Sequence, residues 1–201
     1  MRQGPVAITG GLCALVALTA CGSSSRSSTI HALTTSRSTG AGHSRVFSVP
    51  GMALHFNYPP AFSLRLAQSH RLAGNTTQAS EAAVGIGRYD LLIVSRFPHR
   101  PIRVTVANLA RLRPQFDAAI TEALGHRVRS QVVTLAGLPA LSYPPAPVSG
   151  LPVKASSRII NVFVGDDQYE LNCQYTPAHA ATIGAACDEM LVTLRVKEPT
   201  R

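Results

Sequence analysis

The sequence lacks any apolar run long enough to span a membrane and lacks the common motifs of a catalytic nucleophile. A spanning helix needs about 20 apolar residues, whereas the apolar stretch 7–18 contains Gly10 and Gly11 and ends shortly before Cys21. No serine stands in Gly-x-Ser-x-Gly or Ser-x-x-Lys, and no cysteine stands in Cys-x-x-Cys. These absences argue against a spanning helix, the usual serine enzymes and a thiol redox or zinc site.

Glycine-rich phosphate loops are also missing. Gly85-Ile86-Gly87 has neither the third glycine nor the following helix of a dinucleotide loop, so it indicates a strand that another group approaches closely. We therefore expect no cofactor, no metal and no nucleic-acid partner. His31 and His43 lie in a polar segment, and His55, His70, His99 and His126 have no acidic partner nearby in sequence.

Acidic residues offer no catalytic pair either. Asp166 and Asp167 fall on a predicted hairpin turn, and Asp188 and Glu189 point away from the apolar stripe of a predicted helix. All four are expected to be solvated surface groups. The sequence therefore predicts a protein that is not an enzyme.

The N-terminus has the pattern of a secretory leader. Arg2 supplies the positive end, 7–18 the apolar segment, and Leu18-Thr19-Ala20-Cys21-Gly22 a box of small residues that ends in cysteine. This box is typical of bacterial lipoproteins, in which cleavage leaves the cysteine as the lipid-bearing N-terminus. The sequence predicts a signal peptide over 1–20 and a lipid anchor, palmitate included, on Cys21. An ordinary leader and an uncleaved anchor are the alternatives.

Serine, threonine and glycine dominate the segment 21–44, which has too few apolar residues to offset the entropy cost of ordering. It is predicted to be a flexible tether. Residues 45–201 have the commonest size of a single domain. The expected location is the extracytoplasmic face of the cell membrane.

Arginine accounts for 17 of the 19 basic residues, against 10 acidic residues. Loss of Arg2 with the leader leaves a net charge of about +8. Guanidinium groups suit phosphate and carboxylate, and a basic domain beside a membrane attracts anionic lipid or wall polymer. A GC-rich genome explains the same composition. The candidate anionic-ligand patch consists of Arg96, Arg100, Arg103, Arg111 and Arg113.

Hydrophobic periodicity predicts an α+β domain. Alternation indicates strands at 54–58, 62–66, 81–88, 91–97, 128–135 and 138–143. Helical spacing begins at Thr105 and ends at Gly125, and Pro114 is expected to divide this segment into two short helices or to kink it near Arg113. The proline-rich loop 144–152 is the expected binding edge.

The C-terminal part predicts a hairpin of strands, 157–164 and 169–175, followed by a helix that opens at Pro177. The apolar faces of the second strand and the helix must meet, which carries Cys173 toward Cys187. Cys13 leaves with the leader and Cys21 takes the lipid, so two thiols remain in an oxidising compartment. We expect a structural disulfide between Cys173 and Cys187. A redox-active or metal-binding pair is the alternative.

Several motifs carry a family resemblance. They are Tyr58-Pro59-Pro60-Ala61-Phe62, Gly137-Leu138-Pro139-Ala140 and Thr193-Leu194-Arg195, within a match over Phe47–Val196. On these residues the chain resembles small actinobacterial-type exported lipoproteins with a PsbP-like fold, the LpqN-like group. Phe62 stands where the family pattern has tryptophan. The resemblance implies an antiparallel sheet flanked by helices and an extracytoplasmic accessory or binding protein without a shared catalytic centre. It carries over no functional residues.

Two functional hypotheses follow. The first is a noncatalytic binding or accessory module of the cell envelope, held to the membrane by its N-terminal lipid, which docks an envelope protein, anionic lipid or wall polymer. The second is an envelope hydrolase or small-ligand carrier with a cleft between sheet and helices. A cleft lined by His55, Tyr58 or Tyr143 beside an acidic residue would favour the second hypothesis.

Overall fold

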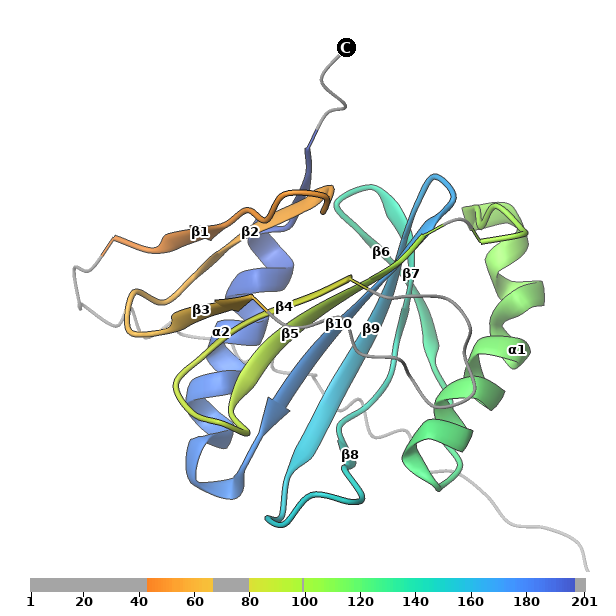
Figure 1. The fold of residues 1–201 in the computed structure, drawn as a ribbon. Helices are drawn as coiled ribbons and strands as arrows, with labels where there is room; N and C mark the ends of the chain where they lie inside the picture. Colours follow the sequence, from red (N-terminus) through yellow and green to blue (C-terminus); the bar gives the residue numbers. More distant parts are fainter. Residues whose placement is uncertain (1–42, 67–79, 99, 198–201) are drawn as a thin grey trace, which may run out of the picture. The chain divides into compact units, whose positions relative to one another are not determined.

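An antiparallel sheet of eight strands organises the part of the chain that the structure describes (Figure 1). The structure is a computed structural model and describes residues 43–66, 80–98 and 100–197, all within the unit 40–201. The strand order is β3-β4-β5-β10-β9-β7-β6, and β8 pairs with β9. The bounds are β3 Ser63–Leu66, β4 Ser80–Gly85, β5 Leu91–Phe97, β6 Gln131–Leu135, β7 Leu138–Ser142, β8 Ala146–Pro147, β9 Ser156–Val164 and β10 Asp167–Tyr175.

A second, smaller sheet has the order β1-β2-β11. Its strands are β1 Arg45–Phe47, β2 Leu54–Tyr58 and β11 Arg195–Val196. The buried rings of Phe47 and Phe56 stack with their centroids 4.5 Å apart. The backbone N–H of Ala53 donates to the hydroxyl of Tyr169 on β10 over 2.9 Å, which ties the small sheet to the large one.

The first helix, α1, covers Val106–Leu124 without interruption. Thr105 and Asn108 form a capping box at its start, and Gly125 ends it in the left-handed region at φ +73. The expected division into two helices at Pro114 is wrong. Pro114 is exposed and removes one backbone donor, but the turns on both sides of it are anchored by buried side chains such as Leu112 and Phe116. Packing therefore outweighs the local cost of the proline.

The second helix, α2, covers Ala180–Thr193 and follows a short 3₁₀ turn, Pro177–His179. It contacts β2, β5 and β10, whereas α1 contacts β6 and β7. The large sheet thus separates two cores, and Figure 1 shows α1 and α2 against different parts of it. Along β10, Tyr169, Leu171 and Cys173 belong to the α2 core, so Gln168 and Glu170 face the α1 side.

Most predicted strands are confirmed. β5 matches 91–97, and β9 and β10 match the predicted C-terminal hairpin within two residues at each end. The close approach at Gly85 is also confirmed, because a Cβ there would collide with the carbonyl oxygen of Asp90. The proline-rich loop 144–152 is not free along its whole length, since β8 lies inside it and pairs with β9.

Candidate functional site

Arg96 and Arg100, the first two members of the predicted patch, have structural partners. The Nε of Arg96 pairs with the carboxylate of Asp167 at 2.8 Å, and its guanidinium also donates to the carbonyl oxygen of Gly51 at 2.8 Å. Asp167, expected on the hairpin turn, is instead the first residue of β10 and the ion-pair partner of Arg96. These contacts bind β5 to the first residue of β10 and to the turn before β2, so the guanidinium of Arg96 is largely engaged within the fold.

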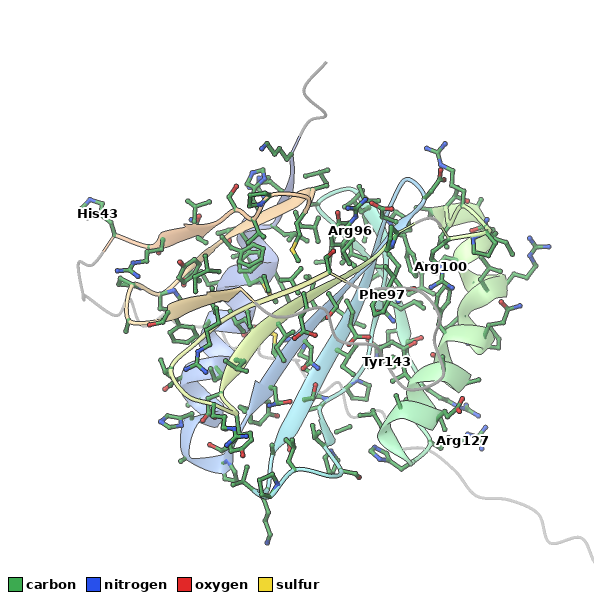
Figure 2. All side chains as sticks on the ribbon, viewed as in Figure 1. His43, Arg96, Phe97, Arg100, Arg127 and Tyr143 are labelled. Atoms are coloured by element: carbon green, nitrogen blue, oxygen red, sulfur yellow. A yellow bond between two sulfur atoms is a disulfide. The ribbon has the colours of Figure 1, made fainter. Side chains whose placement is uncertain are left out.

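Arg100 lies between the large sheet and α1 (Figure 2). Its backbone N–H donates to the carbonyl of Asp166 at 2.8 Å, and its guanidinium donates to the side-chain oxygen of Gln168. The guanidinium also lies over the ring of Phe116, 4.8 Å from the centroid. Burial lowers the pKa of this guanidinium from its ordinary value. Arg100 thus fastens α1 to β10.

The other three arginines, Arg103, Arg111 and Arg113, are exposed, and none forms an ion pair within the described ranges. Arg111 and Arg113 are two residues apart on α1 and so point to different sides of the helix. The structure therefore does not bring the five arginines onto one surface. Beside Arg103, the apolar side chains of Ile102 and Val106 are 51% and 62% exposed.

A chain of buried polar side chains continues from Arg100 across the sheet. The Nε2 of Gln168 donates to Oδ1 of Asn161 at 3.1 Å. Two polar groups nearby, Nδ2 of Asn161 and the hydroxyl of Tyr143, are buried and have no hydrogen-bond partner among the described residues. Such groups are uncommon in folded proteins, and a bound water or ligand commonly satisfies them.

Asp117 on α1 lies close to this hydroxyl. Its Oδ1 accepts hydrogen bonds from the backbone N–H of Ser130 at 3.1 Å and from its hydroxyl at 2.6 Å. Burial, followed by the negative charge of Asp117, raises the pKa of Tyr143 above its ordinary value. A tyrosine beside an acidic residue is thus present between sheet and helix. We name Arg100, Asp117, Tyr143, Asn161 and Gln168 the polar seam.

Two carboxyl groups face the same side of the large sheet. Glu81 on β4 and Glu170 on β10 both lie opposite Ser95 on β5, whose hydroxyl donates to Glu81 at 3.3 Å. Burial, and then the charge of Glu81, raises the pKa of Glu170 to about 7. Glu170 can therefore exchange a proton near neutral pH.

Asp90 and His179 form a pair that the sequence patterns did not predict. Nδ1 of His179 lies 3.1 Å from one carboxylate oxygen of Asp90. The other oxygen accepts hydrogen bonds from the backbone N–H and the hydroxyl of Thr176, at 2.7 and 2.9 Å. Burial by itself raises the pKa of Asp90, but these hydrogen bonds and His179 outweigh it and hold the pKa below the ordinary value. A buried carboxylate that orients a half-exposed imidazole can support proton transfer.

The predicted disulfide is present. Cys173 on β10 and Cys187 on α2 are bridged with their Cα atoms 6.0 Å apart, inside the α2 core. Nearby, Asp188 remains 70% exposed and pairs with Arg158 at 3.0 Å. Glu189 accepts a hydrogen bond from the hydroxyl of Ser44 at 2.7 Å. These two acidic side chains therefore attach α2 to its neighbours.

The other predicted positions do not converge on one site. Tyr58 is buried in the α2 core, whereas Tyr143 belongs to the α1 core on the other face of the sheet. His55 lies between the buried residues Leu54 and Phe56 of β2 and is itself half-buried. His126 lies with Nδ1 3.2 Å from the carbonyl oxygen of Leu124, and His43 is exposed. Cys21, His31, His70 and His99 lie outside the described residues.

Within the described ranges, no group of three or more His, Cys, Asp or Glu side chains could hold a metal ion. A search of the same residues for a helix both long and apolar enough to cross a membrane found none.

The architecture defines the class: the fold is α+β and PsbP-like, with antiparallel sheets and two helices. The solution structure of cyanobacterial PsbP (CyanoP) from Synechocystis sp. PCC 6803 matches 78% of this chain and 95% of that protein, with a TM-score of 0.51 and 13% identity. At this level of identity, the match shows the fold alone. No protein-family model and no curated protein sequence matches the chain.

Two further solved structures are less similar, with TM-scores below 0.5. LpqN from Mycobacterium tuberculosis, described as involved in cell envelope biogenesis, has a TM-score of 0.46 and 14% identity over 78% of this chain and 92% of that protein. A crystal structure from Bacteroides thetaiotaomicron has a TM-score of 0.48 and 11% identity. The match covers 77% of this chain but only 48% of that protein, so this chain spans about half its length.

Proposed function

We propose that this protein is a noncatalytic binding or accessory module of the cell envelope, exported and anchored to the membrane by a lipid on Cys21. The observation that carries the export is the disulfide between Cys173 and Cys187. Disulfides persist in oxidising compartments outside the cytoplasm, and the leader with its cysteine box supplies the route. Export therefore rests on two independent features, the disulfide in the core and the leader at the N-terminus, whereas anchoring rests on the cysteine box alone.

The charge of the α1 layer supports an anionic partner. Residues 100–130 contain six arginines and two acidic residues. Of these arginines, Arg103 in the loop before the helix and Arg113 in the first half of the helix are exposed. Exposed Ile102 and Val106 lie among them, and basic side chains around exposed apolar ones suit the headgroup region of a membrane. We propose that this part of α1 rests on anionic lipid.

Vesicle binding tests the partner. Residues 40–201 are mixed with vesicles of phosphatidylglycerol and phosphatidylcholine, or of phosphatidylcholine alone, and sedimented. We expect binding to the anionic vesicles that weakens as salt increases. Arg103→Glu combined with Arg113→Glu is expected to weaken binding by about thirtyfold or more, since each basic residue near such a surface contributes about 1 kcal/mol and about 2 kcal/mol corresponds to roughly thirtyfold. Arg45→Glu on β1 is the matched control. Equal binding to both vesicle types would refute the lipid contact. So would a protein that binds neither vesicle type but sediments with wall polymer in a parallel assay.

The polar seam favours a second candidate function, that of a small-ligand carrier. Its basis is the pair of buried groups without partners among the described residues, the Tyr143 hydroxyl and Nδ2 of Asn161. Native mass spectrometry of the protein released gently from its membrane tests this candidate. A bound small molecule that is lost in Tyr143→Phe supports a carrier, and a mass equal to the bare lipidated chain in both proteins opposes it.

A further inference from the structure

One edge of the large sheet lacks the usual protection against pairing. β6 is the last strand in the order, with β7 on one side and, among the described residues, no strand on the other. Edge strands are commonly protected by charge, proline or a bulge. The strand Gln131–Leu135 contains no charged residue and no proline, and Val132 is 41% exposed. The opposite edge strand, β3, carries Arg65.

The hairpin geometry identifies which backbone groups of β6 point outward. Ala136 and Gly137 both have positive φ, +50 and +78, as in the two-residue turn that favours hairpins. Leu135 and Leu138 flank the turn as partners, so Leu135 and every second residue before it exchange hydrogen bonds with β7. The N–H and C=O groups of Val132 and Thr134 therefore point away from β7.

Pro139 provides an independent check of this assignment. It lies opposite Thr134 on β7. A proline has no N–H to donate, so its position fits a pair that exchanges no hydrogen bonds. Thr134 then has both of its backbone groups directed toward the outer side, where a further strand would pair.

Two arginines mark one end of this edge. Arg127 and Arg129 are exposed in the extended segment before β6, and neither forms an ion pair within the described ranges. Residues two apart in an extended chain point to the same side. The hydrogen bonds from Ser130 to Asp117 fix this segment against α1. An antiparallel strand beside β6 would place its C-terminal end next to the two arginines.

We propose that β6 is a strand-addition site for an extended segment of a partner protein, rich in β-branched residues and carrying Asp or Glu at its C-terminal end. Backbone hydrogen bonds to Val132 and Thr134 would supply affinity, and the arginines would set direction. A five-residue strand offers much less area than the roughly 1,600 Å² of a standard interface. This favours a short segment over a second copy of the chain. The site is separate from the lipid contact proposed above.

A displayed library of random ten-residue peptides tests the proposal on residues 40–201. We expect the selected peptides to alternate β-branched residues and to end in Asp or Glu. Binding of a synthetic copy of one peptide is expected to weaken at least tenfold in Thr134→Pro, which removes an outward donor and no hydrogen bond to β7, and to persist in Thr134→Ala. Arg127→Glu with Arg129→Glu is expected to shift selection toward peptides with basic C-terminal ends.

Hydrogen exchange on the unaltered protein keeps the test valid if Thr134→Pro does not fold. Adding the peptide is expected to slow exchange at the amides of Val132 and Thr134 and to leave Val133 and Leu135 unchanged. Selected peptides without these features, unchanged binding in a folded Thr134→Pro, or protection elsewhere would overturn the proposal. So would self-association that Thr134→Pro abolishes, because the occupant would then be a second copy.

Discussion

At the scale of single residues, two carboxyl groups have environments that shift their titration in opposite directions. Asp90 is held ionised by Thr176 and His179, so its pKa is lowered. Desolvation, followed by the nearby charge of Glu81, raises the pKa of Glu170 to about 7. Linkage converts these shifts into opposite dependences of stability on pH.

Asp90 is expected to stabilise the fold at neutral pH. Because its folded pKa lies below the unfolded value of about 3.9, this contribution is present above pH 4 and is lost as the pH falls through the folded pKa. Asp90→Asn is expected to cost about 1 to 3 kcal/mol at pH 7, since it disrupts a buried hydrogen-bonded network. Thermal unfolding from pH 2 to 7 measures the effect. Asp166→Asn on the exposed turn is the control, and equal losses in both variants would refute the role.

Glu170 is expected to make the fold less stable as the pH rises, the opposite of the effect of Asp90. The folded state retains its proton between the unfolded pKa, about 4.3, and about pH 7, so the free energy of unfolding falls as the pH rises through this range. Glu170→Gln removes the penalty and is expected to raise Tm by a few degrees at pH 8, with little effect at pH 4. Glu122→Gln, on the exposed side of α1, is the comparison. A lower Tm for Glu170→Gln at pH 8 would contradict this expectation.

At the scale of elements, hydrophobic periodicity was sufficient to predict the C-terminal hairpin, the helix after it and the disulfide between them. The alternation of β9 and β10 and the apolar stripe of α2 require that Cys173 and Cys187 face each other, and the structure confirms the bridge. Local sequence did not predict that α1 continues through Pro114. The helix continues because buried side chains on both sides of the proline anchor its turns.

Contacts between distant segments could not be predicted. Arg96 pairs with Asp167, 71 residues away, only because of the register between β5 and β10. The pair of Asp90 and His179 likewise depends on how the sheet brings a turn to the start of α2. In the candidate patch, Arg103, Arg111 and Arg113 are therefore exposed, whereas Arg96 and Arg100 make internal contacts.

The disulfide is expected to stabilise the contact between β10 and α2. Its partners are separated by 14 residues, and a loop of this size corresponds to about 3 kcal/mol in the chain-entropy model. Replacing both cysteines, Cys173→Ser and Cys187→Ser, is expected to lower Tm by several degrees. The unaltered domain is expected to lose a similar amount in reductant, whereas the variant does not respond. An unaltered Tm in reductant would show that the bridge contributes nothing.

At the scale of the whole molecule, the proposals assign different tasks to different parts. The lipid on Cys21 would hold the chain at the membrane, the first half of α1 would rest on anionic headgroups, and the edge at β6 would remain available to a partner strand. The α2 segment, 177–194, has no lysine or arginine and contains Asp188 and Glu189. This difference from the arginine-rich segment 100–130 would favour the α1 side at an anionic surface.

Intact-mass analysis of the protein from the membrane fraction of its own cells tests the central claim, lipid anchoring at Cys21, most directly. We expect a mature chain that begins at Cys21 and carries a diacylglyceryl group, with or without a further acyl chain. The Cys21→Ala variant, as control, is expected to lose that mass and to leave the membrane fraction. A chain that retains residues 1–20, or an unmodified Cys21 in the soluble fraction, would contradict lipid anchoring.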